Sequence, residues 1–304
     1  MSASVVGSRP ASMRSAKDSP RSIVALARIE AARLMRHPIL AAGLVCYAAF
    51  TATFRWFTYP DADYTGDVSS AGTFDWTVIG ALLVGLFGFV AANRVARSTD
   101  RTAGLVDASP MSQSRRTLAL CFACLAPFAV TVLGNAVILV MWLVHPPVLQ
   151  PGWFEVATSE KVWVLATAAL TGLGGPVLGV AVANWWRWPG ALAVTGAALV
   201  VWCVTSAGVV SSLALRLLHV SGPYTTPEYS DETSAIIWQG GSLMWRFAYV
   251  VGLVVLAAIA AVAYGTVGLR RRRLQRLAVA VGTATLVAYV LAVFVGPAAR
   301  LIAQ

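Results

Sequence analysis

Charged side chains are scarce in this chain. They make up 12% of the 304 residues, whereas 58% are hydrophobic and the mean hydropathy is +0.72. A water-soluble globule cannot bury that much apolar surface. Several stretches of about 20 residues contain no charge, and this is the length that crosses a bilayer. The composition excludes an ordinary soluble domain and predicts an all-α polytopic membrane protein.

Catalytic motifs are also missing. No G-x-x-x-x-G-K-[ST] phosphate loop occurs, so the chain cannot bind ATP by that route. His37, His145 and His219 share no helix face and no metal-ligand spacing, and we interpret them as surface residues. Ser211 and Ser212 have no base nearby in sequence. We therefore predict no catalytic, cofactor-binding or metal-binding residue and no enzymatic activity. A membrane enzyme acting on lipids would have to use the acidic residues predicted outside, which are Asp61, Asp63, Asp67, Asp75, Glu228, Asp231 and Glu232.

The cysteines imply no disulfide framework. Cys46, Cys121, Cys124 and Cys203 all fall in apolar stretches, where a thiol behaves as a small polarizable core side chain. Cys121 and Cys124 have the spacing of a redox pair, but redox chemistry needs access to soluble thiols. Packing is the favoured interpretation of both.

No ionisable residue lies in the middle of a predicted span. Transporters driven by protons or sodium usually carry one there, because the driving ion is bound at depth. The polar groups within these spans are serines, threonines, Asn135 and similar uncharged residues. The energy for any transport must therefore come from elsewhere.

Three regions follow one another along the chain. Residues 1–22 are predicted to be a disordered basic cytosolic tail, 23–36 an amphipathic helix, and 37–304 a transmembrane helical domain. At 100° per residue, one stripe of the 23–36 helix is apolar and consists of Ile23, Val24, Ala27, Ala31, Leu34 and Met35. The remaining surface is mostly charged, with Leu26 and Ile29 interrupting it, and carries Arg28, Glu30, Arg33 and Arg36. The favoured interpretation is a helix in the cytosolic interface with its arginines toward anionic headgroups, and the alternative is a solvated extension of the next helix.

Six or seven spans are predicted after the break at His37 and Pro38. Their approximate limits are 39–57, 76–92, 117–144, 162–183, 190–215, 243–269 and 277–295. With seven spans the C-terminus would lie outside. The alternative is a final helix lying along the inner surface.

The basic residues are distributed unevenly between the two sides of these spans. One side carries 18 of the 23 and the other side 5, which places the N-terminus in the cytosol by the positive-inside rule. Because the basic residues form short clusters and no continuous face, we expect no nucleic-acid partner.

The fourth span is rich in glycine. Gly172, Gly174, Gly175 and Gly179 lie around Pro176. Such residues allow a neighbouring helix to approach closely or allow the helix to bend. We favour close packing over a gating hinge.

The loop between the second and third spans is distinctive. Residues 93–116 combine both charges with an apolar pair, Leu105 and Val106, and Ser109 or Ser112 is placed to cap the third helix. An apolar pair with charges around it suits a modest interface with a cytosolic partner, whereas an ordinary solvated loop is the alternative. The residues predicted for this contact are Arg97, Asp100, Arg101, Leu105, Val106 and Asp107.

The run ALARIEAARLMRHPIL before the first span, followed by the charged loop that closes with ASPMSQSRRTLAL, resembles bacterial ABC-2-type permease subunits, especially those of actinobacteria. The resemblance covers about residues 23–140. It implies an elbow helix at 23–36 and a loop at 94–116 that docks on a separate cytosolic ATP-binding subunit. It also implies a homodimer or heterodimer of permease subunits in the bacterial plasma membrane, and export as the direction of transport. Such subunits usually have six spans, so a seventh is a departure. A membrane anchor that recruits a cytosolic partner without transport is the alternative function.

Overall fold

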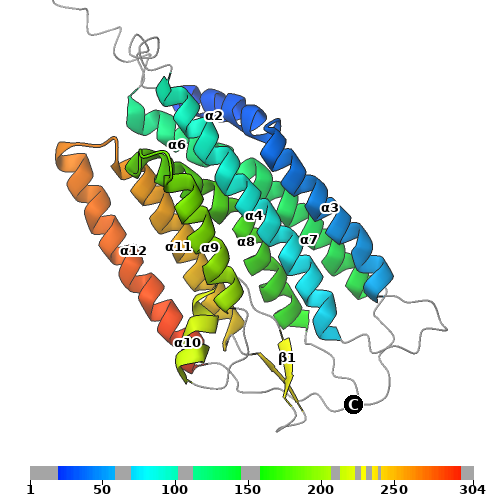
Figure 1. Cartoon of the computed structure of the whole chain (residues 1–304). Coiled ribbons are helices and arrows are strands. Elements are labelled where there is room, and N and C mark those ends of the chain that lie inside the picture. Colours follow the sequence, from blue (N-terminus) through cyan, green and yellow to red (C-terminus); the bar gives the residue numbers. More distant parts are fainter. Residues whose placement is uncertain are drawn as a thin grey trace, which may run out of the picture.

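The computed structural model describes residues 20–58, 70–101, 112–144, 158–206, 213–222, 227–230, 235–238 and 241–295. Residues 1–19, the greater part of the predicted tail, lie outside the described residues. Figure 1 shows a bundle of roughly parallel and antiparallel helices in the described part of the chain. Its helices are α2 (Pro20–Met35), α3 (Pro38–Thr58), α4 (Ser70–Arg101), α6 (Gln113–Ala123), α7 (Leu125–Val144), α8 (Thr158–Trp185), α9 (Ala191–Ser206), α10 (Leu213–Ser221), α11 (Leu243–Ala263) and α12 (Gly268–Phe294).

The prediction of a helical membrane protein is confirmed. Within the described residues, five helices are long and apolar enough to cross a membrane, and the number is six if the bent pair α2–α3 counts as one span. The structure adds a short antiparallel ribbon of β1 (Pro227–Ser230) and β2 (Ala235–Trp238), in which Pro227 pairs with Trp238. This ribbon lies beyond one end of the bundle (Figure 1).

The predicted break at His37 and Pro38 is present. The axes of α2 and α3 differ by 69° there. The His37 amide donates to Leu34 O at 3.1 Å and closes α2, while His37 O accepts from the Ala41 amide at 2.9 Å and opens α3. The His37 Nδ1 atom also accepts from the Ile39 amide at 3.3 Å, so the imidazole acts as a cap for the new helix.

The tightest crossing in the bundle joins α4 and α8 through glycines. A Cβ atom on Gly85 would lie 2.7 Å from Thr171 O, and one on Gly175 would overlap Gly85 O. A Cβ atom on Gly179 would overlap the backbone of Phe89 in the same way. Close packing, the favoured interpretation of the glycine-rich span, is therefore confirmed, because the two backbones touch where side chains are missing.

Uncharged polar groups in the spans connect neighbouring helices. On α3, the Tyr47 hydroxyl donates to Asn135 Oδ1 of α7 at 2.7 Å. Asn135 Nδ2 in turn donates to Leu165 O of α8 at 2.7 Å. Thr131 Oγ1 of α7 donates to Ala169 O of α8 at 3.0 Å. These polar residues satisfy one another in an apolar medium and hold α3 and α7 against α8.

Several predicted helix limits are wrong. α4 continues to Arg101, so the first part of the predicted 93–116 loop is helical. The third predicted span is present as one stretch, Gln113–Met141, that is long and apolar enough to cross a membrane, but its helix has a turn at Cys124, where Pro127 has no N–H to donate to Ala123 O. α12 begins at Gly268, so the residues Arg270 to Arg273 lie in its first turns, and the connection to α11 is instead made by residues 264–267.

The predicted fifth span, 190–215, is two helices with residues 207–212, outside the described residues, between them. α9 has 16 residues and ends where the Thr205 and Ser206 hydroxyls bond back to Val201 O and Cys203 O. Hydroxyl groups that compete for backbone carbonyls in this way weaken a helix. The nine-residue α10 follows, and it is too short to span a bilayer.

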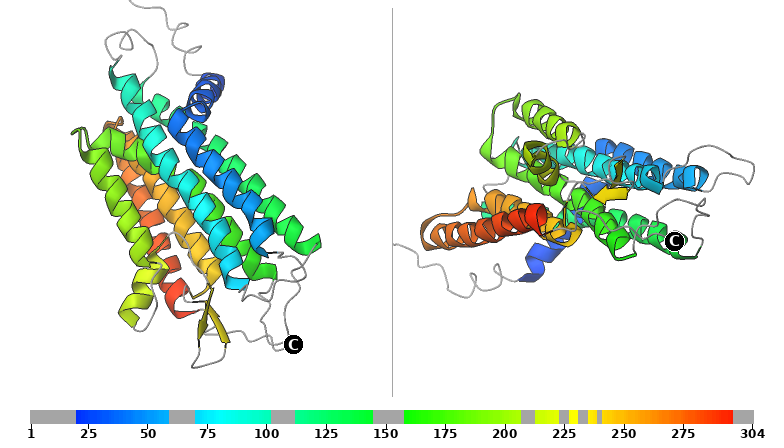
Figure 2. Two further views of the ribbon diagram at one scale, coloured as in Figure 1. Left: turned by 45° about the vertical axis from the view of Figure 1, so that its right-hand side comes forward. Right: turned by 90° about the horizontal axis from the view of Figure 1, so that it is seen from below.

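The last helix, α12, runs along the length of the bundle. α11 and α12 form an antiparallel hairpin, with the 264–267 connection at one end and a bond from the Ser242 amide to Ala292 O at the other. Figure 2 shows α12 running beside α11 over its length. The alternative of a final helix lying along the inner surface does not fit this arrangement.

Candidate functional site

Arginines gather at one end of the bundle, which we call the basic end. Figure 1 shows α2, the start of α6, the α8–α9 connection and the α11–α12 connection at this end, and α10 with the ribbon at the opposite, far end. The two acidic residues of the described helices on this side are Glu30 and Asp100. The arginines of the described residues at the basic end are Arg21, Arg28, Arg33, Arg36, Arg94, Arg97, Arg101, Arg115, Arg116, Arg187, Arg270, Arg271, Arg272, Arg273 and Arg276.

The predicted interfacial helix, α2, packs mainly on α6. Of its predicted apolar stripe, Ala27 and Leu34 are buried, and Ile23, Ala31 and Met35 are partly buried. Protein therefore covers part of the stripe where lipid was expected. Val24, assigned to the stripe, is exposed, as is Ile29.

The charged residues predicted on this helix point away from the bundle or toward α4. Arg28 and Arg36 are exposed. Arg33 forms an ion pair with Glu30 at 3.1 Å, and its second terminal nitrogen donates to Ser98 Oγ of α4 at 3.5 Å. The structure therefore brings the predicted interfacial helix next to the start of the predicted docking region.

The predicted contact residues for a partner fall into two groups. Arg97, Asp100 and Arg101 lie in the last two turns of α4, where a loop was predicted. Leu105, Val106 and Asp107 lie outside the described residues. Ser112 is at the N-cap of α6, yet its hydroxyl makes no capping bond and instead lies 3.3 Å from Ser114 Oγ.

Contacts at the α8–α9 connection link α4, α8 and α11 at the basic end. The Arg97 guanidinium donates to Trp186 O at 2.8 Å, which joins α4 to this connection. Trp185 Nε1 donates to Ala260 O of α11 at 2.8 Å, and its ring stacks edge-on against Tyr264. The Arg187 guanidinium lies 5.3 Å from the centre of the Tyr264 ring, within the range of a cation–π contact. This end of α4, α8 and α11 is a connected unit.

Sequence reasoning missed a buried arginine at the far end. Arg246, in the first turn of α11, has no exposed surface and donates to His219 O at 3.0 Å and to Gly222 O at 2.9 Å. These carbonyls belong to the C-terminal end of α10. The negative end of the helix dipole and the unbonded carbonyls there both favour a cation.

Other side chains form hydrogen bonds to the same end of α10. The Tyr289 hydroxyl of α12 donates to Leu217 O at 2.7 Å, and the Tyr249 hydroxyl of α11 donates to Ser221 O at 3.2 Å. Trp202 Nε1 of α9 donates to Ser221 Oγ at 3.0 Å. Three helices, α9, α11 and α12, therefore meet around the last turn of α10.

The interpretation of His219 as a surface residue is wrong. Its exposed fraction is 3%, because α10 packs against α9 and α12. Burial, together with the nearby Arg246 charge, lowers the pKa of His219 to about 4, while a hydrogen bond with the Ser206 backbone acts in the opposite direction. The imidazole is neutral at physiological pH.

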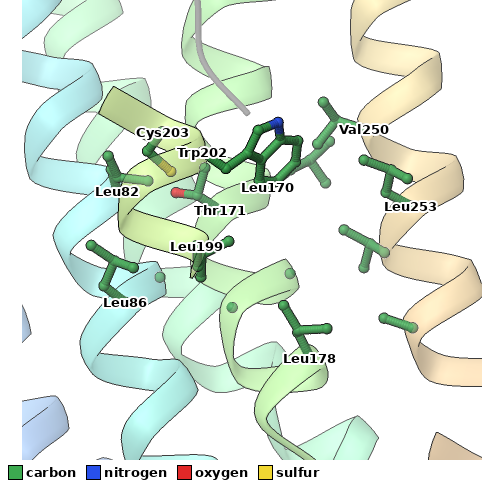
Figure 3. Close-up of a pocket in the computed structure, with 15 residues that line it drawn as sticks. Leu82, Leu86, Leu170, Thr171, Leu178, Leu199, Trp202, Cys203, Val250 and Leu253 are labelled. Carbon is green, nitrogen blue, oxygen red and sulfur yellow. The ribbon is translucent and has the colours of Figure 1, made fainter. Parts of the chain in front are cut away.

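A cavity of about 260 Å³ lies inside the bundle between α4, α8, α9 and α11. Figure 3 shows Leu82 and Leu86 on one side of it, Val250 and Leu253 on the other, and Trp202 across its end. Gly174 and Gly175 of the glycine-rich span leave part of this space open. Trp202, which lies near the middle of the predicted 190–215 span, also lines this space.

No metal-binding cluster of three or more His, Cys, Asp or Glu occurs in the part of the chain that the structure describes.

In comparison with known proteins, the chain matches no protein-family model, no curated protein and no solved structure.

Proposed function

We propose that this protein is the membrane-spanning subunit of an ATP-driven exporter of the ABC-2 type, working with a separate cytosolic ATPase. The observation that carries the proposal is the construction of the basic end. There α2 is bent by 69° from α3 and packs along α6, and Arg33 connects it to Ser98 of α4, within the predicted 94–116 docking region. A bent helix that contacts α4 and α6, the two helices on either side of residues 102–111, supports a role as a platform for a cytosolic partner.

The distribution of charge within the spans supports an external energy source. In the described spanning helices the acidic residues are Asp75, Asp100 and Glu160, and all three lie within the first or last two turns. The two buried basic residues of these helices, Lys161 and Arg246, both lie in first turns. A carboxylate at mid-depth is what ion-coupled transport would need.

The proposal includes a second permease subunit, identical or related, in a bacterial plasma membrane with the basic end in the cytosol. α7 and α12 present apolar side chains to the outside, among them Leu133, Val137, Val279 and Val287, each more than half exposed. In a membrane these faces contact lipid or another helix, so they are available for pairing within the bilayer.

Copurification of the ATPase tests the proposal. Replacing Leu105 and Val106 together by Asp is expected to reduce recovery of the ATPase at least about tenfold at matched membrane levels, because carboxylates buried in a contact are costly. The matched control replaces Val267 and Leu269 by Asp, since both are exposed apolar residues at the same end of the bundle.

The control is expected to retain the ATPase. Equal recovery with all three proteins would show that the predicted 94–116 docking region is not the dock. Recovery of no ATPase with the wild-type protein would favour the membrane-anchor function.

A further inference from the structure

The cavity between α4, α8, α9 and α11 has a wall made almost wholly of hydrocarbon. Leucines and valines from all four helices form it, together with the glycines of α8 and the ring of Trp202. No charged residue of the described chain lines it. Its volume of about 260 Å³ exceeds the roughly 150 Å³ at which an engineered apolar cavity takes up benzene. The space therefore suits an apolar ligand larger than a single ring.

The polar groups at the wall are already engaged within the protein. Thr171 Oγ1 bonds to Ala168 O at 2.7 Å and to Ala81 O at 2.8 Å. Trp202 donates its single N–H to Ser221 Oγ. A ligand that needed hydrogen-bond donors would find those of Thr171 and Trp202 engaged, so burying its polar acceptor atoms here would be unfavourable.

The cavity also has a thin outer wall. Among the described residues of α9, three are buried, namely Ala191, Cys203 and Ser206, while Val194, Val200, Val201 and Val204 face outward. α9 is joined to the bundle by the α8–α9 connection at one end and by the Trp202 bond to Ser221 at the other. Apart from this single helix, nothing described in the structure separates that side of the cavity from the surroundings of the bundle.

We propose that this cavity binds the hydrocarbon chain of a membrane lipid, inserted from the bilayer beside α9. The chain is a membrane-spanning protein, and acyl chains are the apolar molecules that surround it. An acyl chain is wholly apolar and needs no hydrogen bond, which matches a wall whose hydrogen-bond donors are engaged. The proposal does not depend on an ATPase and stands whether or not the protein transports anything.

Photolabelling tests the proposal on the full-length protein in phosphatidylcholine nanodiscs. The probe is hexadecanoic acid with a diazirine in mid-chain, and labelled residues are located by mass spectrometry. The expected result in the wild-type protein is labelling of cavity residues, such as Leu170 and Val250, in addition to the outward residues of α9.

The Leu199→Trp variant places a larger side chain in the cavity and is expected to reduce labelling of cavity residues about tenfold, since overpacking disfavours the ligand. The matched control, Val200→Trp, enlarges the neighbouring exposed residue and is expected to leave cavity labelling unchanged. Labelling of Val201 and Val204 should be equal in all proteins and reports contact with bulk lipid.

A second filling variant, Val254→Phe, narrows the cavity from α11 and serves if Leu199→Trp does not fold. Absence of labelled cavity residues in the wild-type protein would overturn the proposal. Undiminished cavity labelling in a folded filling variant would overturn it as well.

Discussion

Arg246 illustrates how one buried side chain fixes a short helix. α10 has nine residues and, without partners, its last carbonyls would be left unbonded in an apolar setting. The guanidinium of Arg246 supplies two donors to them and carries the charge that the helix end favours. The residue is therefore structural, even though a buried arginine in a membrane protein invites a functional interpretation.

Replacing Arg246 by Met is expected to lower the free energy of unfolding by about 2–3 kcal/mol, because two charge-assisted bonds to the α10 carbonyls are lost. The measurement is the thermal unfolding midpoint of the purified protein in detergent. Arg276→Met, at an exposed position of α12, is the matched control and should leave the midpoint nearly unchanged. Equal midpoints for the two variants would contradict the role assigned to Arg246.

His219 makes the stability of this region depend on pH. Its pKa is about 4 in the folded protein and about 6.5 in the unfolded chain. Between these values the unfolded chain binds more protons, so stability rises with pH, and it falls as the pH decreases from about 6.5 toward about 4. His219→Gln removes the titrating group. We expect the unfolding midpoint of this variant to fall less between pH 7.5 and pH 5 than that of the wild-type protein. Identical shifts would count against the burial of His219.

The burial of Arg246 and of His219 could not have been predicted from the sequence. An arginine in the first turn of an apolar helix usually extends its charge to the membrane surface. The burial of Arg246 depends on the carbonyls of His219 and Gly222, which lie more than 20 residues earlier in the chain, and on the α10 fold that carries them. The sequence pattern of residues 190–215 predicted one long helix and thereby concealed α10.

At the scale of elements, the crossing of α4 and α8 is the centre of the bundle. It depends on the absence of side chains at Gly85, Gly175 and Gly179, where the two backbones touch. α8 is the most deeply buried of the spans, with 72% of its most apolar stretch inside the protein. A substitution at this crossing is therefore expected to disturb every helix that packs on α8.

The Gly175→Ala substitution is expected to destabilise the bundle by several kcal/mol or to prevent folding, because the added methyl group would overlap the Gly85 carbonyl, which is backbone and cannot rotate away. Gly282→Ala on α12 is the matched control, since a methyl group there would have no described atom of another residue within 4 Å beyond its own helix backbone and chain neighbours. This control is expected to be neutral or stabilising by up to about 1 kcal/mol, as alanine is the better helix former. Comparison of yields and unfolding midpoints in detergent distinguishes the two.

The sequence predicted the elements better than their limits. Pro38 correctly marked the bend between α2 and α3, and the glycines of residues 172–179 correctly indicated a close helix contact. The extension of α4 to Arg101 was missed because charged residues were interpreted as loop, although arginine is a good helix former in water. For the same reason the start of α12 was missed. Its first turns contain Arg270 to Arg273, which were interpreted as part of a turn.

At the scale of the whole molecule, the charge distribution predicts the orientation in the membrane. The structure brings arginines from α2, α4, α6, α12 and the α8–α9 connection to the same end. By the positive-inside rule we predict that this end faces the cytosol.

Cysteine labelling from either side of the membrane tests this orientation. A cysteine replacing the exposed Arg272 at the start of α12 is expected to react with an impermeant maleimide after the membrane is permeabilised, because it lies at the basic end. A cysteine replacing Val295, at the far end of the same helix, is expected to react in intact cells. Reaction of both from the same side would contradict a final helix that crosses the membrane. The reverse pattern would place the basic end outside.

The shortness of α9 has a consequence for the bilayer itself. Its 16 residues make a helix about 24 Å long, whereas the hydrocarbon layer is about 30 Å thick. Trp186 and Trp188 are exposed at its basic end, where tryptophan favours the headgroup region, so we expect the mismatch to fall on the opposite leaflet. We therefore expect that leaflet to be thinner beside α9 and to favour lipids with shorter tails there.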